Sequence, residues 1–141
     1  MNAVSEKAVL EQANLRRGNG ELVLVVDDEE MVREVTKEIL ERFNYHVVLA
    51  ANGAEAIALY TRQQREIAVI LTDMVMPVMD GAALVVAVKT INPQALVIGT
   101  SGYGSADDMV KATGGTVKHF VPKPHTAETI LNALYTVLHE P

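Results

Sequence analysis

From residue 21 onward, short apolar runs alternate along the chain with longer segments whose apolar residues recur at helical spacing. Several runs are apolar at successive positions rather than at every second one, which is typical of strands buried on both faces of a parallel sheet. The alternation therefore predicts strands separated by helices. The five predicted strands are Leu22–Val26, His46–Ala50, Ile67–Thr72, Ala95–Gly99 and Val117–Val121.

The first two of five predicted helices have clear signals. The second opens at Asn52, a favourable N-cap, and Glu55 three residues later can complete a capping box. The first has apolar residues close to the i, i+3, i+7, i+8 pattern of a helix that packs on a core. This predicted stripe consists of Val32, Val35, Ile39, Leu40 and Phe43.

The other three helices are bounded by breakers and caps. The third is predicted from Asp80 to about Ile91, because Asn92-Pro93 then ends it. The fourth opens at Ser105 and stops at Gly114-Gly115. The last begins at about Thr126, and its predicted inner face consists of Ile130, Leu131, Leu134, Val137 and Leu138.

Repeated strand–helix units of this length predict an α/β fold with a doubly wound parallel sheet and right-handed crossovers. For five strands the flavodoxin-like order 2-1-3-4-5 is favoured, which places a topological switch point between the first and third strands. Residues 1–20 are expected to be an N-terminal tail or linker, because Gly18-Asn19-Gly20 interrupts any helix that starts there. Residues 21–141 are expected to form one domain.

Composition narrows the classes of function. The chain has 141 residues, of which 49% are hydrophobic and 21% charged, and it has no cysteine, so disulfides, thiolate metal sites and a cysteine nucleophile are excluded. A net charge of −6 argues against a nucleic-acid partner. No apolar run approaches the roughly 18 residues that span a bilayer, so no membrane insertion and a cytoplasmic location are expected.

Polar residues gather where the predicted strands end. Asp27-Asp28 follow the first strand, Asp73 the third, Thr100-Ser101 the fourth, and Lys123 the fifth. Because the carboxyl ends of parallel strands meet at one edge of the sheet, we expect these side chains to form one small site.

The expected site suits a hard cation and phosphoryl chemistry. Two carboxylates about 4 Å apart repel by roughly 4 kcal/mol at an effective dielectric constant of about 20, so this cluster requires a cation or a proton. Oxygen ligands favour Mg²⁺ over zinc. With such an ion, Asp73 could attack a phosphorus atom, while Lys123 and the hydroxyl of Ser101 stabilise the transferred group.

The combination resembles the receiver domain of two-component response regulators, including regulators of the chemotaxis type. The similarity covers about residues 21–139, and the combination of motifs is highly specific. The matching stretches are Val25 to Glu30, Leu71 to Pro77 with Met79-Asp80-Gly81, Thr100 to Tyr103, and Phe120 to Pro124.

The resemblance implies a role for each residue of the site. Asp73 would accept a phosphoryl group from a phosphohistidine, and Asp28, Asp73 and the backbone carbonyl of Val75 would bind Mg²⁺, for which Mn²⁺ is expected to substitute. Asp27 would act through a water molecule. Lys123 would pair with the phosphoryl group. The switch residues would be Ser101 and Phe120. Because phenylalanine has no hydroxyl group, Phe120 cannot form the hydrogen bond that a tyrosine at this position would use in switching.

The resemblance also implies partners. The phosphoryl donor would be a cognate histidine kinase or a phosphotransfer domain. Phosphorylation would change the face formed by the fourth helix, fifth strand and fifth helix, through which a downstream protein or a second copy would bind. The segment Arg16 to Glu21 is similar to the lead-in of receivers at the ends of hybrid histidine kinases, so a receiver of such a kinase is an alternative to a stand-alone protein.

Three other functions are less compatible with the sequence. A dehalogenase-type phosphatase would place its nucleophile in an Asp-x-Asp pattern after the first strand, where this chain has Asp27-Asp28-Glu29. A flavodoxin relative would need a phosphate-binding loop there, and acidic residues would repel the phosphate. A receiver-like binding module without chemistry would lack some site residue, and none is missing. We therefore expect a phosphoacceptor that promotes its own phosphorylation and dephosphorylation, not an enzyme with a separate substrate.

Overall fold

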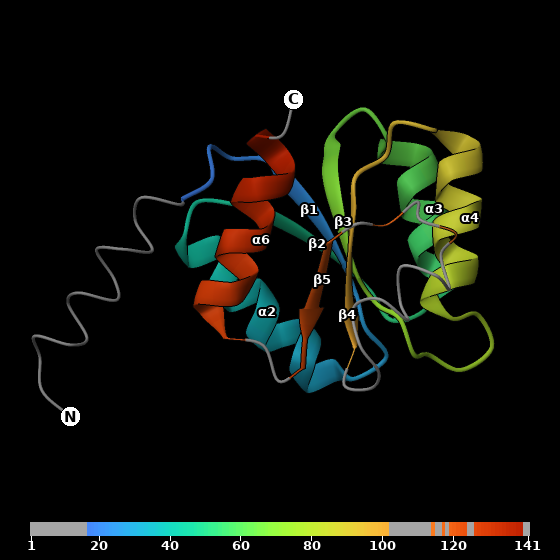
Figure 1. The fold of residues 1–141 in the computed structure, drawn as a ribbon, viewed down its shortest axis with the longest axis horizontal. Coiled ribbons are helices and arrows are strands. Elements are labelled where there is room, and N and C mark those ends of the chain that lie inside the picture. Colours follow the sequence, from blue (N-terminus) through green and yellow to red (C-terminus); the bar gives the residue numbers. More distant parts are fainter. Residues whose placement is uncertain (1–16, 102–113, 115–116, 118, 124–125, 140–141) are drawn as a thin grey trace, which may run out of the picture.

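One five-stranded parallel sheet forms the centre of the molecule. The computed structural model describes residues 17–101, 114, 117, 119–123 and 126–139. The strand order is β2-β1-β3-β4-β5, as the sequence predicts, and every neighbouring pair is parallel (Figure 1). In chain order the elements are β1 (Leu22–Val26), α2 (Glu30–Arg42), β2 (His46–Ala50), α3 (Gly53–Gln63), β3 (Ile67–Asp73), α4 (Gly81–Ile91), β4 (Val97–Ser101), β5 (His119–Pro122) and α6 (Ala127–His139).

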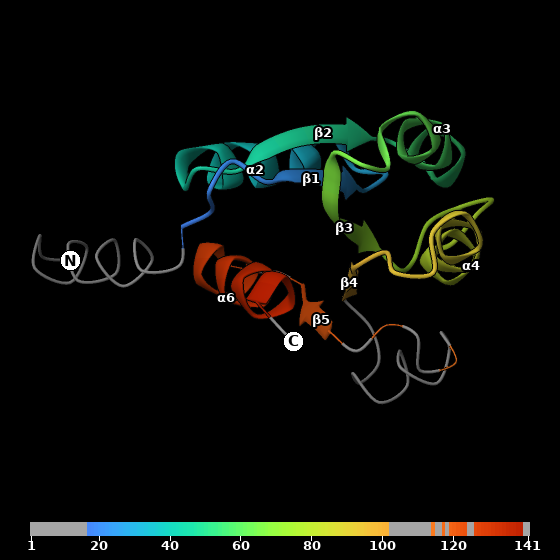
Figure 2. The same ribbon diagram turned by 90° about the horizontal axis from the view of Figure 1, so that it is seen from above.

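The helices cover the sheet on both faces. Helices α2 and α6 lie on one face, and α3 and α4 lie on the other (Figures 1 and 2). Each face has its own apolar core, because the central strands β1 and β3 are buried on both sides. The core under α2 and α6 includes Val25, Leu40, Leu71, Ile130 and Leu134, and the core under α3 and α4 includes Leu24, Tyr60, Ile70, Leu84 and Val88.

Two predicted strands begin too early in the chain. The run predicted as Ala95–Gly99 forms β4 only from Val97, and the run predicted from Val117 forms β5 only from His119. Ala95 and Val117 are nevertheless buried, and the N–H of Ala95 donates to the carbonyl of Asn92 in the turn after α4. Apolar residues leading into a buried strand therefore lengthened the predicted runs.

Within the described residues there are four helices, each of which was predicted. Of the helix predicted from Ser105 to Gly114-Gly115, only Gly114 at its end lies within the described part of the chain. The predicted stripe of α2 is wrong at Val35, which is 53% exposed, whereas Thr36 is buried. Thr36, Leu40 and Phe43 are four and three residues apart, so they lie on the same, buried face of the helix. Val35 is turned by about 100° from Thr36 and therefore lies outside this face.

Side-chain caps fix the beginnings of α3 and α4. The Asn52 side chain accepts a hydrogen bond from the N–H of Glu55 at 2.8 Å, and the Glu55 carboxylate accepts one from the N–H of Ala51 at 3.2 Å. The predicted capping interaction is confirmed, although its return bond reaches Ala51 instead of Asn52. Asp80 caps α4 by accepting from the N–H of Ala83 at 2.9 Å.

The segment before β1 packs against the turn between α2 and β2. The N–H of Gly18 donates to the carbonyl of Phe43 at 2.9 Å, and the Asn44 side chain donates to the carbonyl of Gly18 at 2.7 Å. Asn44 adopts a positive φ of 71°, which its short polar side chain tolerates. A Cβ at Gly18 would lie 2.5 Å from the ring of Tyr45, so only glycine allows this close contact.

Gly81 lets α4 approach the end of β3. A Cβ at this position would lie 2.7 Å from the Met74 Cα and 2.8 Å from the Asp73 carbonyl oxygen, and backbone atoms cannot move aside cheaply. We expect Gly81→Ala to lower the free energy of unfolding by about 1–3 kcal/mol, measured by urea denaturation. Gly53→Ala is the control, because its Cβ would meet only the flexible side chain of Met79. Equal losses in both variants would contradict this explanation.

No helix among the described residues is both long enough and apolar enough to span a lipid bilayer.

Candidate functional site

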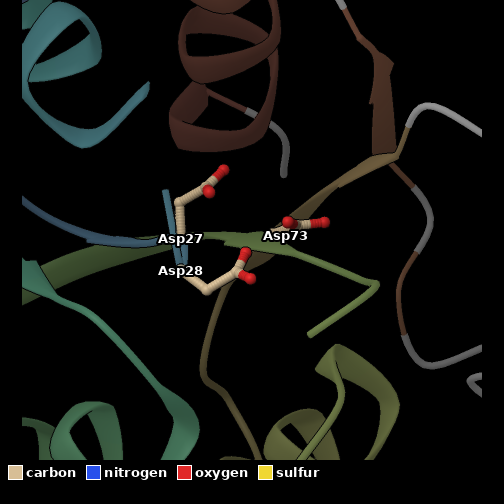
Figure 3. A group of neighbouring side chains, drawn as sticks. All are labelled: Asp27, Asp28 and Asp73. Atoms are coloured by element: carbon tan, nitrogen blue, oxygen red, sulfur yellow. The ribbon is translucent and has the colours of Figure 1, made fainter. Parts of the chain in front are cut away.

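Three aspartates meet at the carboxyl edge of the sheet, at the switch point between β1 and β3. Asp27 and Asp28 directly follow β1, and Asp73 is the last residue of β3. One carboxylate oxygen from each lies within 4.8 Å of the others (Figure 3). Asp27 and Asp73 are buried, and Asp28 is exposed. The convergence predicted from the strand ends is therefore found.

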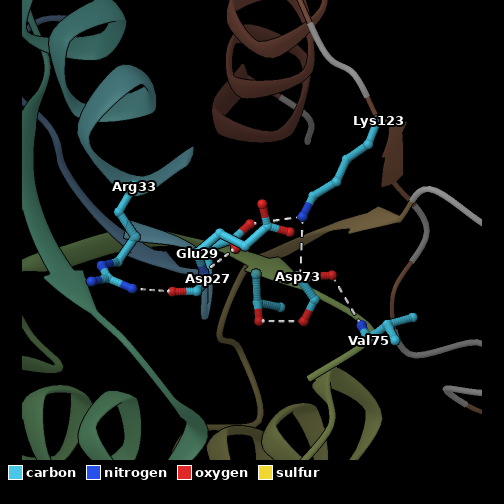
Figure 4. Close-up of polar contacts among 7 residues, drawn as sticks. Asp27, Glu29, Arg33, Asp73, Val75 and Lys123 are labelled. Carbon is cyan, nitrogen blue, oxygen red and sulfur yellow. Dashed lines mark hydrogen bonds and ion pairs between the residues drawn. The ribbon is translucent and has the colours of Figure 1, made fainter. Parts of the chain in front are cut away.

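Both carboxylate oxygens of Asp27 are engaged within the protein. Its Oδ1 accepts the N–H of Glu29 at 2.9 Å, and its Oδ2 pairs with the Lys123 ammonium at 2.8 Å (Figure 4). The Arg33 guanidinium donates to the backbone carbonyl of Asp27 at 2.8 Å. This residue is therefore held by β1, by the first turn of α2 and by the segment after β5.

Asp28 is the most available of the three carboxylates. Within the described part of the chain, its side chain takes part in no hydrogen bond or ion pair that would occupy its oxygens. It is exposed at the rim of the cluster, next to the two buried carboxylates (Figure 3). An incoming cation could therefore bind Asp28 without displacing a protein partner.

Asp73 is oriented by one donor on each carboxylate oxygen. The N–H of Val75 donates to its Oδ1 at 3.0 Å, and the Lys123 ammonium lies 3.1 Å from its Oδ2. Asp73 pairs in register with Thr100 of β4, and the N–H of Met74 donates to the carbonyl of Thr100 at 2.8 Å. The end of β3 is thus fixed to β4, while the two donors hold the carboxylate in place.

Lys123 and Ser101 reach the same edge from the neighbouring strands. The N–H of Lys123 donates to the carbonyl of Ser101 at 3.0 Å, and its ammonium bridges Asp27 and Asp73 (Figure 4). Ser101 ends β4 and is half-buried. Phe120 lies on β5, three residues before Lys123, and packs against the core under α3 and α4. All the residues predicted for the site therefore lie at or beside this edge.

Burial and pairing shift the pKa values of Asp73 and Lys123 upward. Burial raises the pKa of Asp73; the Val75 N–H and Lys123 lower it only in part, and the charge of Asp27 raises it further. Burial lowers the pKa of Lys123, but hydrogen bonds and charges from the two aspartates outweigh this effect and leave its pKa raised. A pairing partner would by itself lower the pKa of Asp73. It does not prevail because burial of the Asp73 carboxylate has the largest effect on its pKa.

Asp73→Asn is expected to stabilise the metal-free protein at neutral pH. The folded-state pKa of Asp73 lies above its unfolded value, so the parent loses stability as the pH rises through the folded-state pKa, and Asn removes this loss. Thermal unfolding in the presence of a chelator should show a higher Tm for the variant at pH 7. The difference should vanish below the ordinary aspartate pKa of about 3.9. A lower Tm for the variant at pH 7 would contradict a raised pKa of Asp73 in the folded protein.

One contact in the site was not foreseen from the sequence. Arg33 was not among the predicted residues, although its guanidinium secures the backbone of Asp27. Its signal in the sequence is only a basic residue six positions after the aspartate, early in the helix that follows. Such spacing is common in exposed helices, so it could not have been singled out.

Comparison with known proteins identifies the class. The response regulator receiver domain matches residues 23–135, and the chain therefore belongs to the response regulator receiver family. It is 32% identical over 118 residues to the chemotaxis protein CheY of Bacillus subtilis, covering 83% of this chain and 97% of that protein. It is 30% identical to the sensor kinase CckA of Brucella abortus over 98% of this chain but 14% of the kinase.

Solved structures agree with this family. CheY in the CheX–CheY–BeF3–Mg²⁺ complex from Borrelia burgdorferi matches with a TM-score of 0.79 and 26% identity, covering 84% of this chain and 90% of that one. The chain is thus a phosphoryl-accepting signalling domain of two-component systems, as its sequence motifs predicted. The phosphatase and flavodoxin alternatives are not supported.

Proposed function

We propose that Asp73 accepts the phosphoryl group, in a Mg²⁺-dependent transfer from the phosphohistidine of a histidine kinase or phosphotransfer domain. The observation that carries this proposal is the cluster of three carboxylates, two of which, Asp27 and Asp73, share the ammonium group of Lys123. Asp73 is the member at the end of the central strand β3, with its carboxylate oriented by Val75 and Lys123. A buried, oriented carboxylate next to a cation site is suited to attack phosphorus.

The donor set fits Mg²⁺. It offers only oxygen ligands in the cluster, and Asp28 has no competing partner among the described residues. We assign Asp28, Asp73 and the backbone carbonyl of Val75 as direct ligands. Asp27 acts through a water molecule, in keeping with the two partners that already occupy its oxygens. When bound, Mg²⁺ neutralises charge between the carboxylates and the phosphoryl oxygens, and Mn²⁺ is expected to substitute.

The protein groups orient and stabilise the transferred group. A carboxylate oxygen of Asp73 forms the new bond to phosphorus while the bond from phosphorus to the imidazole nitrogen of the donor breaks. Lys123 moves its ammonium from the Asp73 oxygen to a phosphoryl oxygen, and the Ser101 hydroxyl donates to another. Both contributions are electrostatic, which is the main requirement of phosphoryl transfer. The same groups support the later hydrolysis of the acyl phosphate.

The phosphoryl group would act as a switch. Its charge draws Ser101 and Lys123 toward Asp73, and Phe120 responds through the strand that carries Lys123. We assign the resulting change to one face of the receiver. This face is formed by the helix predicted from Ser105 to Gly114-Gly115, by β5 and by α6. A downstream protein or a second copy would bind there. The similarity to CckA over almost the whole chain is compatible with a receiver that belongs to a hybrid kinase.

Incubation with a small acyl phosphate and Mg²⁺ tests the proposal. Intact-mass analysis should show one added phosphoryl group, which is lost over time because an aspartyl phosphate hydrolyses. The same protein should not turn over a phosphomonoester repeatedly. Labelling at more than one position, or sustained phosphomonoester turnover, would count against a single-site phosphoacceptor.

A further inference from the structure

The peptide unit between Asp73 and Met74 is held at both of its polar groups. Its carbonyl, on Asp73, accepts a hydrogen bond from the hydroxyl of Thr72 at 3.0 Å, and its N–H, on Met74, donates to the carbonyl of Thr100 at 2.8 Å. A trans peptide unit is planar, and its C=O and N–H point in opposite directions. The unit therefore cannot turn about the line between its two Cα atoms without breaking both hydrogen bonds.

Thr72 supplies the first of these bonds from inside the protein. Its side chain is fully buried, so its hydroxyl requires a partner within the fold. Side chains two residues apart on a strand point to the same face, and Ile70 belongs to the core under α3 and α4. Among the described residues, the register of β1 with β3 ends at Thr72, so no residue of β1 is paired with Asp73. The Thr72 hydroxyl thus provides a donor at the point where the pairing with β1 stops.

The beginning of α4 encloses the same carbonyl. A Cβ on Gly81 would lie 2.8 Å from the Asp73 carbonyl oxygen, and the N–H of Gly81 donates to the carbonyl of Met74 at 3.2 Å. Water has little access to this carbonyl, because Asp73 is buried. Loss of the Thr72 hydroxyl would therefore remove a hydrogen bond that solvent does not readily replace.

Turning this peptide unit would move Val75 relative to the Asp73 carboxylate. The N–H of Val75 donates to Asp73 Oδ1 at 3.0 Å (Figure 4). Met74 alone separates the two residues in the chain, so the position of Val75 depends directly on the orientation of the peptide unit before Met74. A loosened peptide unit would weaken the donor that orients the carboxylate.

We infer that Thr72 is a positioning residue for the phosphoacceptor. Its hydroxyl fixes the peptide unit between Asp73 and Met74 and thereby keeps the Val75 N–H on the Asp73 carboxylate. This inference deepens the proposed phosphoacceptor function and rests on it for the effect on phosphoryl transfer. Thr72 is buried beneath the site and acts through the backbone of Asp73 and Val75.

Thr72→Val tests the hydroxyl, because valine has nearly the same shape but no donor. At saturating Mg²⁺, the rate of labelling by a small acyl phosphate should fall about tenfold, since a misplaced nucleophile reacts slowly even with the cation bound. Thr72→Ser retains the hydroxyl and should be labelled at nearly the parent rate. Equal losses in the two variants would overturn the inference, because packing and not the hydroxyl would then be responsible.

Amide hydrogen exchange of Val75 gives a readout that does not depend on phosphorylation. In Thr72→Val we expect the Val75 amide to exchange about tenfold faster than in the parent, because its hydrogen bond to Asp73 opens more often. Thr72→Ser should restore the slower exchange. An unchanged exchange rate of Val75 in Thr72→Val would refute the role of Thr72.

Ile70→Val is the matched control for stability. It removes a methylene from the same face of β3 and should lower Tm without changing the exchange of Val75 or the rate of labelling. If it slows labelling as much as Thr72→Val does, the cause is lost stability and the inference is wrong. Absence of labelling in the parent would refute the proposed function, and the exchange of Val75 would still decide whether Thr72 positions the peptide unit.

Discussion

Asp73→Asn is expected to abolish labelling by a small acyl phosphate in the presence of Mg²⁺. The amide that replaces the carboxylate is a poor nucleophile and carries no charge for the cation, while its size and shape are nearly the same. Because Asp73 ends a strand that is paired on both sides, the variant should keep the same fold. Intact-mass analysis of parent and variant, treated side by side, should show the added phosphoryl group only in the parent.

Asp80→Asn is the control for that experiment. Asp80 lies in the loop after Asp73 but is exposed, and its side chain caps α4, a role that asparagine performs equally well. This variant should be labelled like the parent. If Asp73→Asn is labelled as readily as Asp80→Asn, the phosphoacceptor lies elsewhere and the assignment to Asp73 is wrong.

Asp28→Asn should have the second largest effect, through the cation. We expect the Mg²⁺ concentration that gives half-maximal labelling to rise by about tenfold to a hundredfold, because one of three carboxylate charges near the ion is removed. Complete removal of divalent ions by a chelator should stop labelling of the parent. Mn²⁺, detected by its effect on water proton relaxation, gives an independent measure of the affinity.

Glu29→Gln separates this effect from general surface charge. Glu29 is exposed and adjacent to Asp28, and among the residues that the structure describes its contact with the site is made by its backbone N–H. Its neutralisation should leave the Mg²⁺ dependence almost unchanged. Equal effects of the two substitutions would mean that Asp28 acts only through the overall negative potential and does not ligate the ion.

The sequence determined the location of the site more reliably than the limits of the elements. The parallel sheet could be predicted because its strands are apolar on successive residues, and a parallel sheet necessarily brings the residues after its strands to one edge. Asp27, Asp73 and Lys123 could therefore be placed together although Asp27 and Lys123 are separated by 96 positions. That prediction followed from the order and parallel direction of the strands.

Features that depend on tertiary packing could not be predicted. The exposure of Val35 and the burial of Thr36 depend on which side of α2 meets the sheet. The spacing of apolar residues alone does not decide between two neighbouring positions on a helix. The contact of Phe120 with Gly99 requires the register between β4 and β5, which an apolar run does not specify. Side-chain chemistry marked the functional edge, but the packing partners became visible only in three dimensions.

The packing of Gly18 against the turn at Asn44 has a practical consequence for measuring interactions. Gly18 holds the chain at the amino end of β1, and the aspartates lie at the carboxyl end of this strand. The two ends are separated by the five residues of β1, which rise by about 3.3 Å each. A dye or a surface tether attached ahead of Arg17 would therefore depart from the end remote from Asp73. Immobilisation by that route would leave the phosphoacceptor open to a kinase in solution, which suits a biosensor built on this domain.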